Sequence, residues 1–221
     1  IFSNEATEVS IALDLSVDER IRRVVLNYAE EEISIIGAEA FMAPVDSTET
    51  TLGFFSSDDL GFATLDLGLR FDHVDRDGFI VEMHHDEEHE GEHEEHEGEH
   101  EEHHEGEMEY EPASFSDEVF SAAATLRRDL NQHASLSLSL ASVSKTPSAV
   151  ELFMNGEHLA SSRYELGDIT LDTERSDNID LAFNFDLHGW FGSASVYYNR
   201  VDNYIYLRDE LEEEHEARLE R

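Results

Sequence analysis

Eight of the chain's thirteen histidines lie between His84 and His104, set among glutamates. The seven-residue unit His-Glu-Gly-Glu-His-Glu-Glu starts at His89 and again at His96. Imidazole is the commonest protein ligand for zinc, nickel and copper, and carboxylates complete a ligand shell or attract the cation. The chain has no cysteine, so a metal site here would use nitrogen and oxygen. We predict that the segment binds divalent metal through His84, His85, His89, His93, His96, His100, His103 and His104.

The same segment is too charged to bury an apolar face. Residues 82–111 contain sixteen acidic residues, and no lysine or arginine occurs between Arg76 and Arg127. We therefore expect a disordered His/Glu-rich loop over 82–111 in the absence of metal. Five of its histidines recur at spacings of four, three, four and three, which places them on one face if a helix forms. We expect metal to fold the loop locally and to occupy several exchanging sites; the alternative is a solvated spacer that binds metal incidentally.

The loop formally matches a zinc-protease motif, because 89–93, 96–100 and 100–104 all read H-E-x-x-H. That motif works on a stable helix in a cleft with a third ligand, whereas here a two-letter repeat generates it three times. The chain also lacks a nucleophile elbow, a phosphate-binding glycine loop and cysteine chemistry. The sequence therefore predicts a protein that is not an enzyme.

His73 is a further candidate metal ligand. It lies near Asp72 and Asp75, just before the histidine loop, at what the sequence predicts to be the end of a strand. A captured ion could be passed inward from such a position.

The overall charge indicates which partners to expect. The formal net charge is −39, and removing the sixteen acids of the loop leaves about −23, so acidity extends along the whole chain. Nucleic acid is excluded as a partner, and metal cations or basic ligands are favoured. No secretory signal opens the sequence and no run of 18 apolar residues occurs, so the chain is either soluble or a mature piece of a β-barrel.

Outside the loop, alternation of apolar and polar residues predicts strands. It is clearest in the runs 9–15, 65–71, 136–140 and 179–187, and weaker candidates bring the total to about eight; these are 21–34, 49–57, 115–128 and 191–206. The expected connections alternate between short turns and long loops, the long ones being 35–48, 76–114 and 146–175. This alternation is typical of an all-β, antiparallel transmembrane barrel, although a soluble sandwich also fits strand alternation.

Residues 145–199 resemble the C-terminal barrel half of TonB-dependent outer-membrane receptors. The resemblance rests on Thr146-Pro147-Ser148-Ala149-Val150-Glu151-Leu152-Phe153, on Glu165-Leu166-Gly167-Asp168 and Glu174-Arg175-Ser176, and on Tyr197-Tyr198-Asn199-Arg200. Within the family, Asn155-Gly156-Glu157-His158-Leu159-Ala160 and Ile36-Gly37-Ala38-Glu39-Ala40-Phe41 look most like the zinc-uptake receptors, in which a histidine-rich extracellular loop is also typical. Lys145 departs from the pattern, since the family usually has arginine there.

The resemblance implies a fold, a location and a set of partners. The chain (1–221) would be about eight strands of a larger 22-stranded barrel, in the outer membrane of a Gram-negative bacterium and in contact with its lipid. Zn²⁺ would be the transported ligand, with no organic cofactor. His158 would lie in an extracellular loop facing the substrate path, as a further metal ligand. The inner-membrane TonB complex would act through a plug domain.

The plug domain and most of the barrel strands are not found in this sequence. It also ends in an acidic tail instead of a terminal aromatic strand. We therefore interpret it as an internal fragment of a zinc receptor. The alternatives are a receptor of the same family for haem, nickel or a metal chelate, and a non-transporting metal-binding module.

Overall fold

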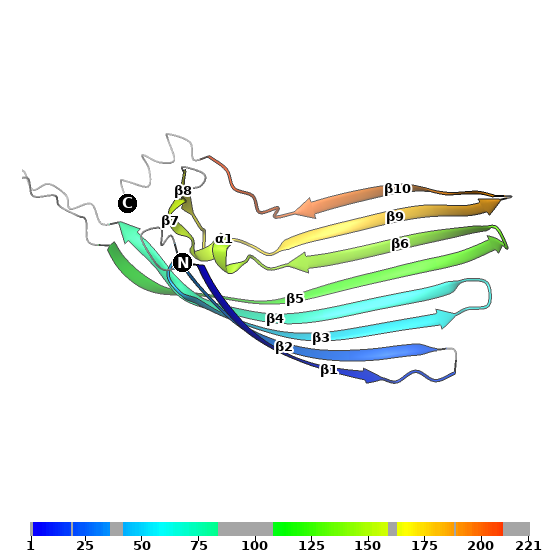
Figure 1. The fold of residues 1–221 in the computed structure, drawn as a ribbon, viewed down its shortest axis with the longest axis horizontal. Coiled ribbons are helices and arrows are strands. Elements are labelled where there is room, and N and C mark those ends of the chain that lie inside the picture. Colours follow the sequence, from blue (N-terminus) through cyan, green and yellow to red (C-terminus); the bar gives the residue numbers. More distant parts are fainter. Residues whose placement is uncertain are drawn as a thin grey trace, which may run out of the picture.

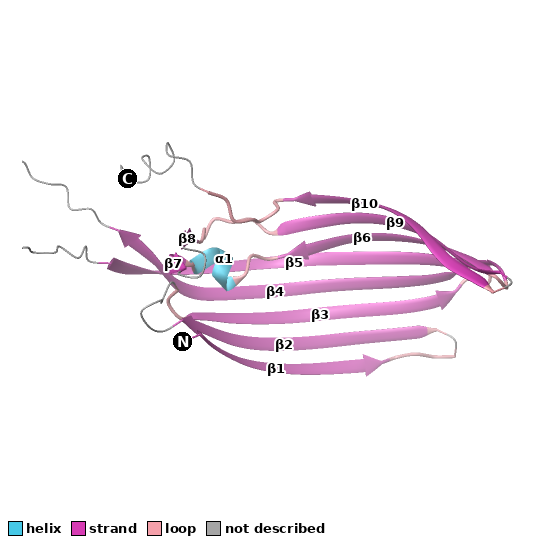
Figure 2. Cartoon of the chain, turned by 45° about the horizontal axis from the view of Figure 1, so that its top comes forward, coloured by secondary structure: helices cyan, strands magenta, loops and turns pink. Residues whose placement is uncertain are grey.

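The computed structural model describes residues 2–18, 20–35, 42–83, 108–158, 163–187 and 189–209. Nearly all of these residues lie in strands that form one curved, antiparallel sheet (Figures 1 and 2). Its order is β1-β2-β3-β4-β5-β6-β9-β10, and β7 and β8 form a separate hairpin. The large sheet comprises β1 (Phe2–Asp14), β2 (Ile21–Ile35), β3 (Val45–Asp59), β4 (Thr64–Met83), β5 (Met108–Asn131), β6 (Ala134–Lys145), β9 (Glu174–Leu187) and β10 (Trp190–Asp202). The hairpin consists of β7 (Asn155–His158) and β8 (Arg163–Leu166), and the helix α1 spans Ala149–Phe153. The predicted all-β antiparallel fold is confirmed.

Strand alternation gives the sheet two chemically different faces, because residues paired directly across strands share a face. On the apolar face, rows in the central part of the sheet are wholly apolar; examples are Ile11-Leu26-Leu52-Phe71-Phe120 and Leu126-Leu138-Leu181-Val196. On the polar face, the neighbouring rows are Ser10-Asn27-Thr51-Asp72-Val119 and Thr125-Ser139-Asp180-Tyr197. Most of the large side chains of the apolar face are exposed; Leu181, for example, is 45% exposed. An apolar face without a protein partner is what a lipid-facing sheet requires.

Connections of different length lie at opposite ends of the sheet (Figure 1). At one end, which we call the turn end, β1–β2, β3–β4, β5–β6 and β9–β10 are joined by short links. At the other, the loop end, the chain takes longer paths between β2 and β3, β4 and β5, and β6 and β9. The predicted alternation of short turns and long loops is confirmed.

All three expected long loops contain regular structure that the sequence did not predict. The segment 35–48 includes the first residues of β3, which begins at Val45. The segment 146–175 includes α1, β7 and β8. Within 76–114, β4 continues to Met83 and β5 begins at Met108. The ends of the predicted disordered loop 82–111 are therefore strands, and residues 84–107 lie outside the described part of the chain.

The β4–β5 hairpin projects beyond its neighbours at the loop end. The last pair between β3 and β4 is Asp46 with Asp77, whereas β4 and β5 continue through six further pairs to Met83 with Met108. At about 3.3 Å per residue, this stem extends roughly 20 Å past the edge of β3. The segment that contains the eight histidines is thus joined at both ends to a projecting hairpin.

A small apolar core holds α1 against the polar face at the loop end. It consists of Ile35, Met42, Val45, Ala149, Leu152 and Phe153. Phe153 lies over Gly78 of β4, where an added Cβ atom would come within 2.9 Å of the phenyl ring. Because Gly78 shares a face with Asp72 and Arg76, α1 covers one end of the polar face. No helix in the described ranges has both the length and the apolar content needed to cross a membrane.

Candidate functional site on the polar face and at the loop end

A compact ionic cluster occupies the middle of the polar face. Arg70 Nε lies 2.7 Å from Asp72 Oδ1, and Arg70 Nη2 lies 2.8 Å from Glu49 Oε1. The Thr51 hydroxyl donates to Asp72 Oδ1 at 2.6 Å. Asp72 is only 3% exposed, so its carboxylate depends on these two partners. Two carboxylates share one guanidinium, which leaves the cluster with a net negative charge.

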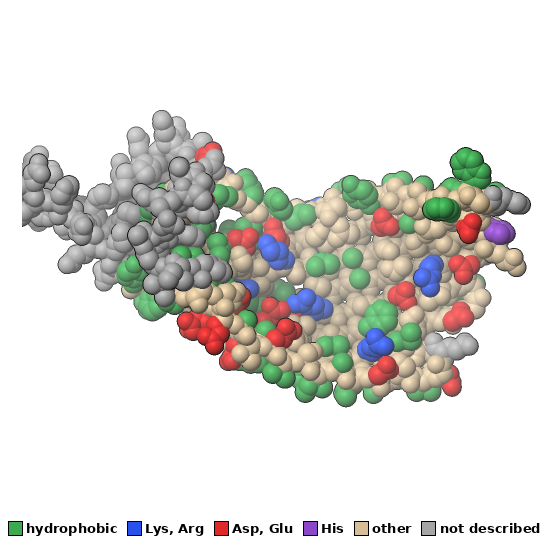
Figure 3. Space-filling view, in the orientation of Figure 1, with side chains coloured by type: hydrophobic (Ala, Val, Ile, Leu, Met, Phe, Trp, Pro, Cys, Tyr) green, Lys and Arg blue, Asp and Glu red, His purple; other side chains and the backbone are tan. Residues whose placement is uncertain are grey.

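This cluster follows from register, which the sequence alone did not supply. Asp72 pairs with Thr51, and Arg70 is two residues away on the same face of β4. Figure 3 shows acidic and basic side chains lying among one another over the sheet. Within the ranges described, no group of three or more His, Asp or Glu side chains is arranged to hold a metal ion. The polar face can therefore attract cations and orient polar ligands, but its described side chains do not form a metal cage.

The Thr146–Phe153 motif positions α1 at the loop end of the polar face. Ser148 and Glu151 form a capping box, in which the Ser148 amide donates to Glu151 Oε2 at 2.7 Å and the Glu151 amide donates to Ser148 Oγ at 3.3 Å. Lys145 lies 3.3 Å from Glu151 and 3.2 Å from Glu174 of β9. The lysine thus ties α1 to the strands on both sides of the long connection.

Acid is expected to weaken this arrangement. Partial burial raises the pKa of Glu151, but hydrogen bonds from the Ser148 amide and hydroxyl and the charge of Lys145 outweigh it, so the pKa lies below 4.5. A lowered pKa contributes stability that is present above pH 4.5 and is lost as the pH falls through the folded-state value.

We predict that Glu151→Ala costs about 1 kcal/mol locally, measured as faster hydrogen exchange at the Leu152 and Met154 amides. Glu151→Gln keeps the capping box and should remove the acid dependence; an acid dependence that persists in this variant would contradict the assignment.

His73 does not occupy the place that the sequence predicted. It lies in the middle of β4, ten residues before the end of the strand, and it pairs with Thr50 and Glu118. Alternation puts it on the apolar face, opposite the Arg70–Asp72 cluster. Its Nε2 lies 3.0 Å from Asp75 Oδ2, and its Nδ1 lies 3.7 Å from Glu118 Oε1. The predicted strand-end position is therefore wrong, while metal binding and ion transfer by His73 stay predictions.

His158 lies at the end of β7, where its backbone pairs with Arg163 of β8. The β7–β8 hairpin follows α1 directly at the loop end (Figure 1). Its predicted place in a connection at the loop end agrees with the structure, and its role as a ligand stays a prediction. The other eight predicted ligands lie outside the described residues; they are His84, His85, His89, His93, His96, His100, His103 and His104.

The loop end also carries a row of carboxylates that sequence reasoning missed. Glu5, Glu32, Asp46 and Asp77 are directly paired across β1, β2, β3 and β4, on the same side as the apolar face. Like charges directly opposite one another are destabilising. In the described part of the chain none of the four lies within ion-pair distance of a basic side chain. Acidity therefore gathers at the end of the sheet where the histidine segment begins.

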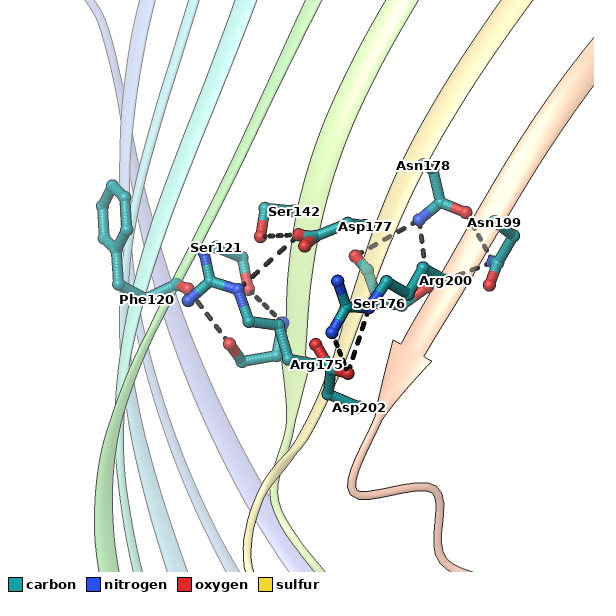
Figure 4. Close-up of polar contacts among 11 residues, drawn as sticks. Phe120, Ser121, Ser142, Arg175, Ser176, Asp177, Asn178, Asn199, Arg200 and Asp202 are labelled. Atoms are coloured by element: carbon teal, nitrogen blue, oxygen red, sulfur yellow. Dashed lines mark hydrogen bonds and ion pairs between the residues drawn. The ribbon is translucent and has the colours of Figure 1, made fainter.

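A polar network joins β6, β9 and β10 near the same end (Figure 4). Ser142 donates to Asp177 Oδ1 at 2.5 Å, and Asn199 donates to Asn178 Oδ1 at 2.6 Å. Arg200 Nη2 lies 2.9 Å from Asp202 Oδ1. The Ser142–Asp177 contact links β6 to β9 on the side of the apolar face, and the Asn178–Asn199 contact links β9 to β10 on the polar face.

Together these features define part of a large transmembrane-type β-barrel. One face is apolar and the other polar, and the long connections lie at one end. Within the described residues, β1 and β10 each pair on one side only, so the sheet is open. The chain belongs to the family described as TonB dependent receptor-like, beta-barrel, whose family model matches residues 23–212. This family consists of transport receptors and not of enzymes.

Solved receptor structures have the same fold. One is a double mutant of the Serratia marcescens hemophore receptor HasR in complex with its hemophore HasA and heme; the TM-score is 0.62 at 16% identity, over 92% of this chain and 33% of that one. Another is the closed form of the ferric-catecholate import receptor Fiu from E. coli K12. Its TM-score is 0.56 at 11% identity, and the match covers 95% of this chain and 32% of that one. The open form of Fiu has a TM-score of 0.56 at 8% identity, and the match covers 91% of this chain and 31% of that one. At these identities the likeness shows the fold alone, and the chain spans about one third of the length of each receptor.

Proposed function

We propose that the full-length receptor to which this sequence contributes captures zinc at the cell surface of a Gram-negative bacterium and imports it across the outer membrane. The histidine-rich segment collects the ion, and His158 holds it near the path through the barrel. Energy for transport comes from the inner-membrane TonB complex, which acts through a plug domain. Membership of the receptor family supports the transport role, and the zinc cargo is inferred from the ligands.

One observation carries the zinc proposal. The segment with eight histidines begins and ends on the β4–β5 hairpin, which projects from the loop end of the sheet. Long connections lie on the extracellular side in barrels of this type. This attachment to the projecting hairpin supports a role of the segment in first contact with an external ion.

Charge at the loop end supports a cationic cargo. Glu5, Glu32, Asp46 and Asp77 have no basic side chain within ion-pair distance in the described part of the chain. Together with the acids of the histidine segment, this carboxylate row produces a negative field, which raises the local concentration of cations. Histidine must be neutral to bind metal. Capture should accordingly weaken below about pH 6.

Metal titration of the purified full-length receptor tests the proposal. We expect calorimetry to show several zinc ions bound per receptor, and a variant with all eight loop histidines changed to asparagine to lose most of them. His133→Asn, at the turn end, is the matched control and should bind as the wild type does. Nickel or haem binding that exceeds zinc binding would assign the receptor to a different cargo. Unchanged zinc binding in the eightfold variant would refute the role of the segment.

A further inference from the structure

The apolar face has charged borders of opposite sign. At the loop end its outward positions are mainly acidic; they include Glu30, Glu32, Asp46, Asp75, Asp77, Glu118 and Asp177. At the turn end, the charged side chains at outward strand and bridge positions of the described chain are three arginines and one carboxylate; these are Arg20, Arg22, Arg128 and Asp58, which we call the basic rim. In a chain of net charge −39 with only 14 lysines and arginines, this local excess of positive charge is a departure from the rest of the molecule.

Register and contacts place the basic rim beside the apolar face. Arg22 pairs with Ser56, and Asp58 pairs with Leu65, which belongs to the apolar face. Ser56 is only 3% exposed although it lies on the outward side. Arg128 pairs with Leu136, two positions from the Leu126–Leu138 pair. Arg22 and Arg128 therefore lie next to the apolar rows on the outward side, and the contact with Asp58 directs the Arg22 guanidinium toward the turn end.

The rim has more positive charge than its own acid can neutralise. Arg22 Nη2 lies 2.7 Å from Asp58 Oδ1, and Arg20 Nε lies 3.9 Å from the same oxygen. The side chain of Arg20 is 77% exposed. No described carboxylate lies within ion-pair distance of Arg128. By contrast, Arg200 at the loop-end border has its own partner, Asp202, at 2.9 Å.

We propose that the basic rim binds the headgroups of anionic phospholipids in the leaflet at the turn end. In barrels of this type, the short turns lie on the periplasmic side, so this is the periplasmic leaflet. Arginines at the border of an apolar band lie at headgroup depth, where lipid phosphates accept their hydrogen bonds. The acidic loop-end border repels the same phosphates, so the charge difference also favours one orientation of the barrel in the membrane. This inference rests on membership of the barrel family and is independent of the cargo.

Lipid binding to the purified full-length receptor tests the proposal. Native mass spectrometry measures the apparent Kd for phosphatidylglycerol and, separately, for phosphatidylcholine. Each basic residue near an anionic lipid surface contributes about a fivefold gain in binding. We expect the triple variant Arg20→Gln/Arg22→Gln/Arg128→Gln to bind phosphatidylglycerol at least about tenfold more weakly, with phosphatidylcholine unchanged. The preference of the wild-type receptor for phosphatidylglycerol over phosphatidylcholine should also decrease with added salt.

The matched control is Arg175→Gln/Arg200→Gln, which removes two outward arginines at the opposite border and should leave phosphatidylglycerol binding as in the wild type. If the triple variant does not fold, Arg128→Gln alone gives the same test with a roughly fivefold effect, because this side chain has no ion pair in the described chain to lose. Equal affinities of wild type and variant for phosphatidylglycerol would overturn the proposal. So would a wild-type receptor that does not distinguish the two lipids.

Discussion

Leu181→Arg should prevent stable membrane insertion of the receptor. Leu181 lies in the middle of β9 on the apolar face, between Leu138 and Val196, and is 45% exposed. An arginine on the lipid face near the bilayer midplane costs about 2–4 kcal/mol. We expect a large loss of folded, membrane-inserted receptor, measured by urea titration in lipid vesicles with heat-modifiable gel mobility as the readout.

The neighbouring residue supplies the control for this experiment. Ala182 is on the polar face, between Ser137 and Ser195. Ala182→Arg introduces the same charge one residue away and should be tolerated. The loss of folded, membrane-inserted receptor should be much smaller than for Leu181→Arg. Equal destabilisation by the two variants, or the reverse order, would contradict the assignment of the apolar face to lipid.

Gly167→Ala is expected to release α1 from the chain segment that follows β8. A Cβ atom at Gly167 would lie 2.7 Å from the Leu152 carbonyl carbon, 2.8 Å from the Leu152 oxygen and 2.9 Å from the Glu151 oxygen. These are backbone atoms, so no side-chain rotation relieves the overlap. The Gly167 amide also donates to the Met154 carbonyl at 2.6 Å. Overpacking of this kind costs about 1–3 kcal/mol.

The release should be visible as faster hydrogen exchange and easier proteolysis within 146–173. Gly68→Ala is the matched control, since nothing lies within 4 Å of its added Cβ atom. We expect this control to behave as the wild type does. An α1 segment that stays equally protected in Gly167→Ala would show that the close approach of the two backbones is not needed for docking.

The sheet could be predicted from the sequence wherever alternation is strong. In β9, Ile179, Leu181, Phe183 and Phe185 alternate with smaller or polar residues, and the predicted run 179–187 lies within Glu174–Leu187. The outer parts of β4 and β5 could not be predicted in this way. Their residues near Asp77 and Gly78 break the alternation, and the two arms are held by pairing with each other beyond the edge of β3.

Short elements and register account for what the sequence did not predict. The five residues of α1 are too few for a helical period, although Ser148 and Glu151 at the spacing of a capping box were a readable signal. The sequence predicts a strand end near His73 because the alternation breaks beyond it, whereas β4 continues to Met83. The Arg70–Asp72–Glu49 cluster and the carboxylate row need the pairing of specific strands, which a single sequence does not contain.

Zinc uptake by zinc-starved cells that express the full-length receptor tests the central claim most directly. The comparison is between the wild-type receptor and one lacking residues 84–104, at equal amounts in the outer membrane. We predict receptor-dependent uptake that falls at low zinc when the segment is removed and recovers at high zinc, because the segment concentrates the ion. Absence of receptor-dependent zinc uptake in the wild type, or uptake at low zinc that is unaffected by the deletion, would contradict the account.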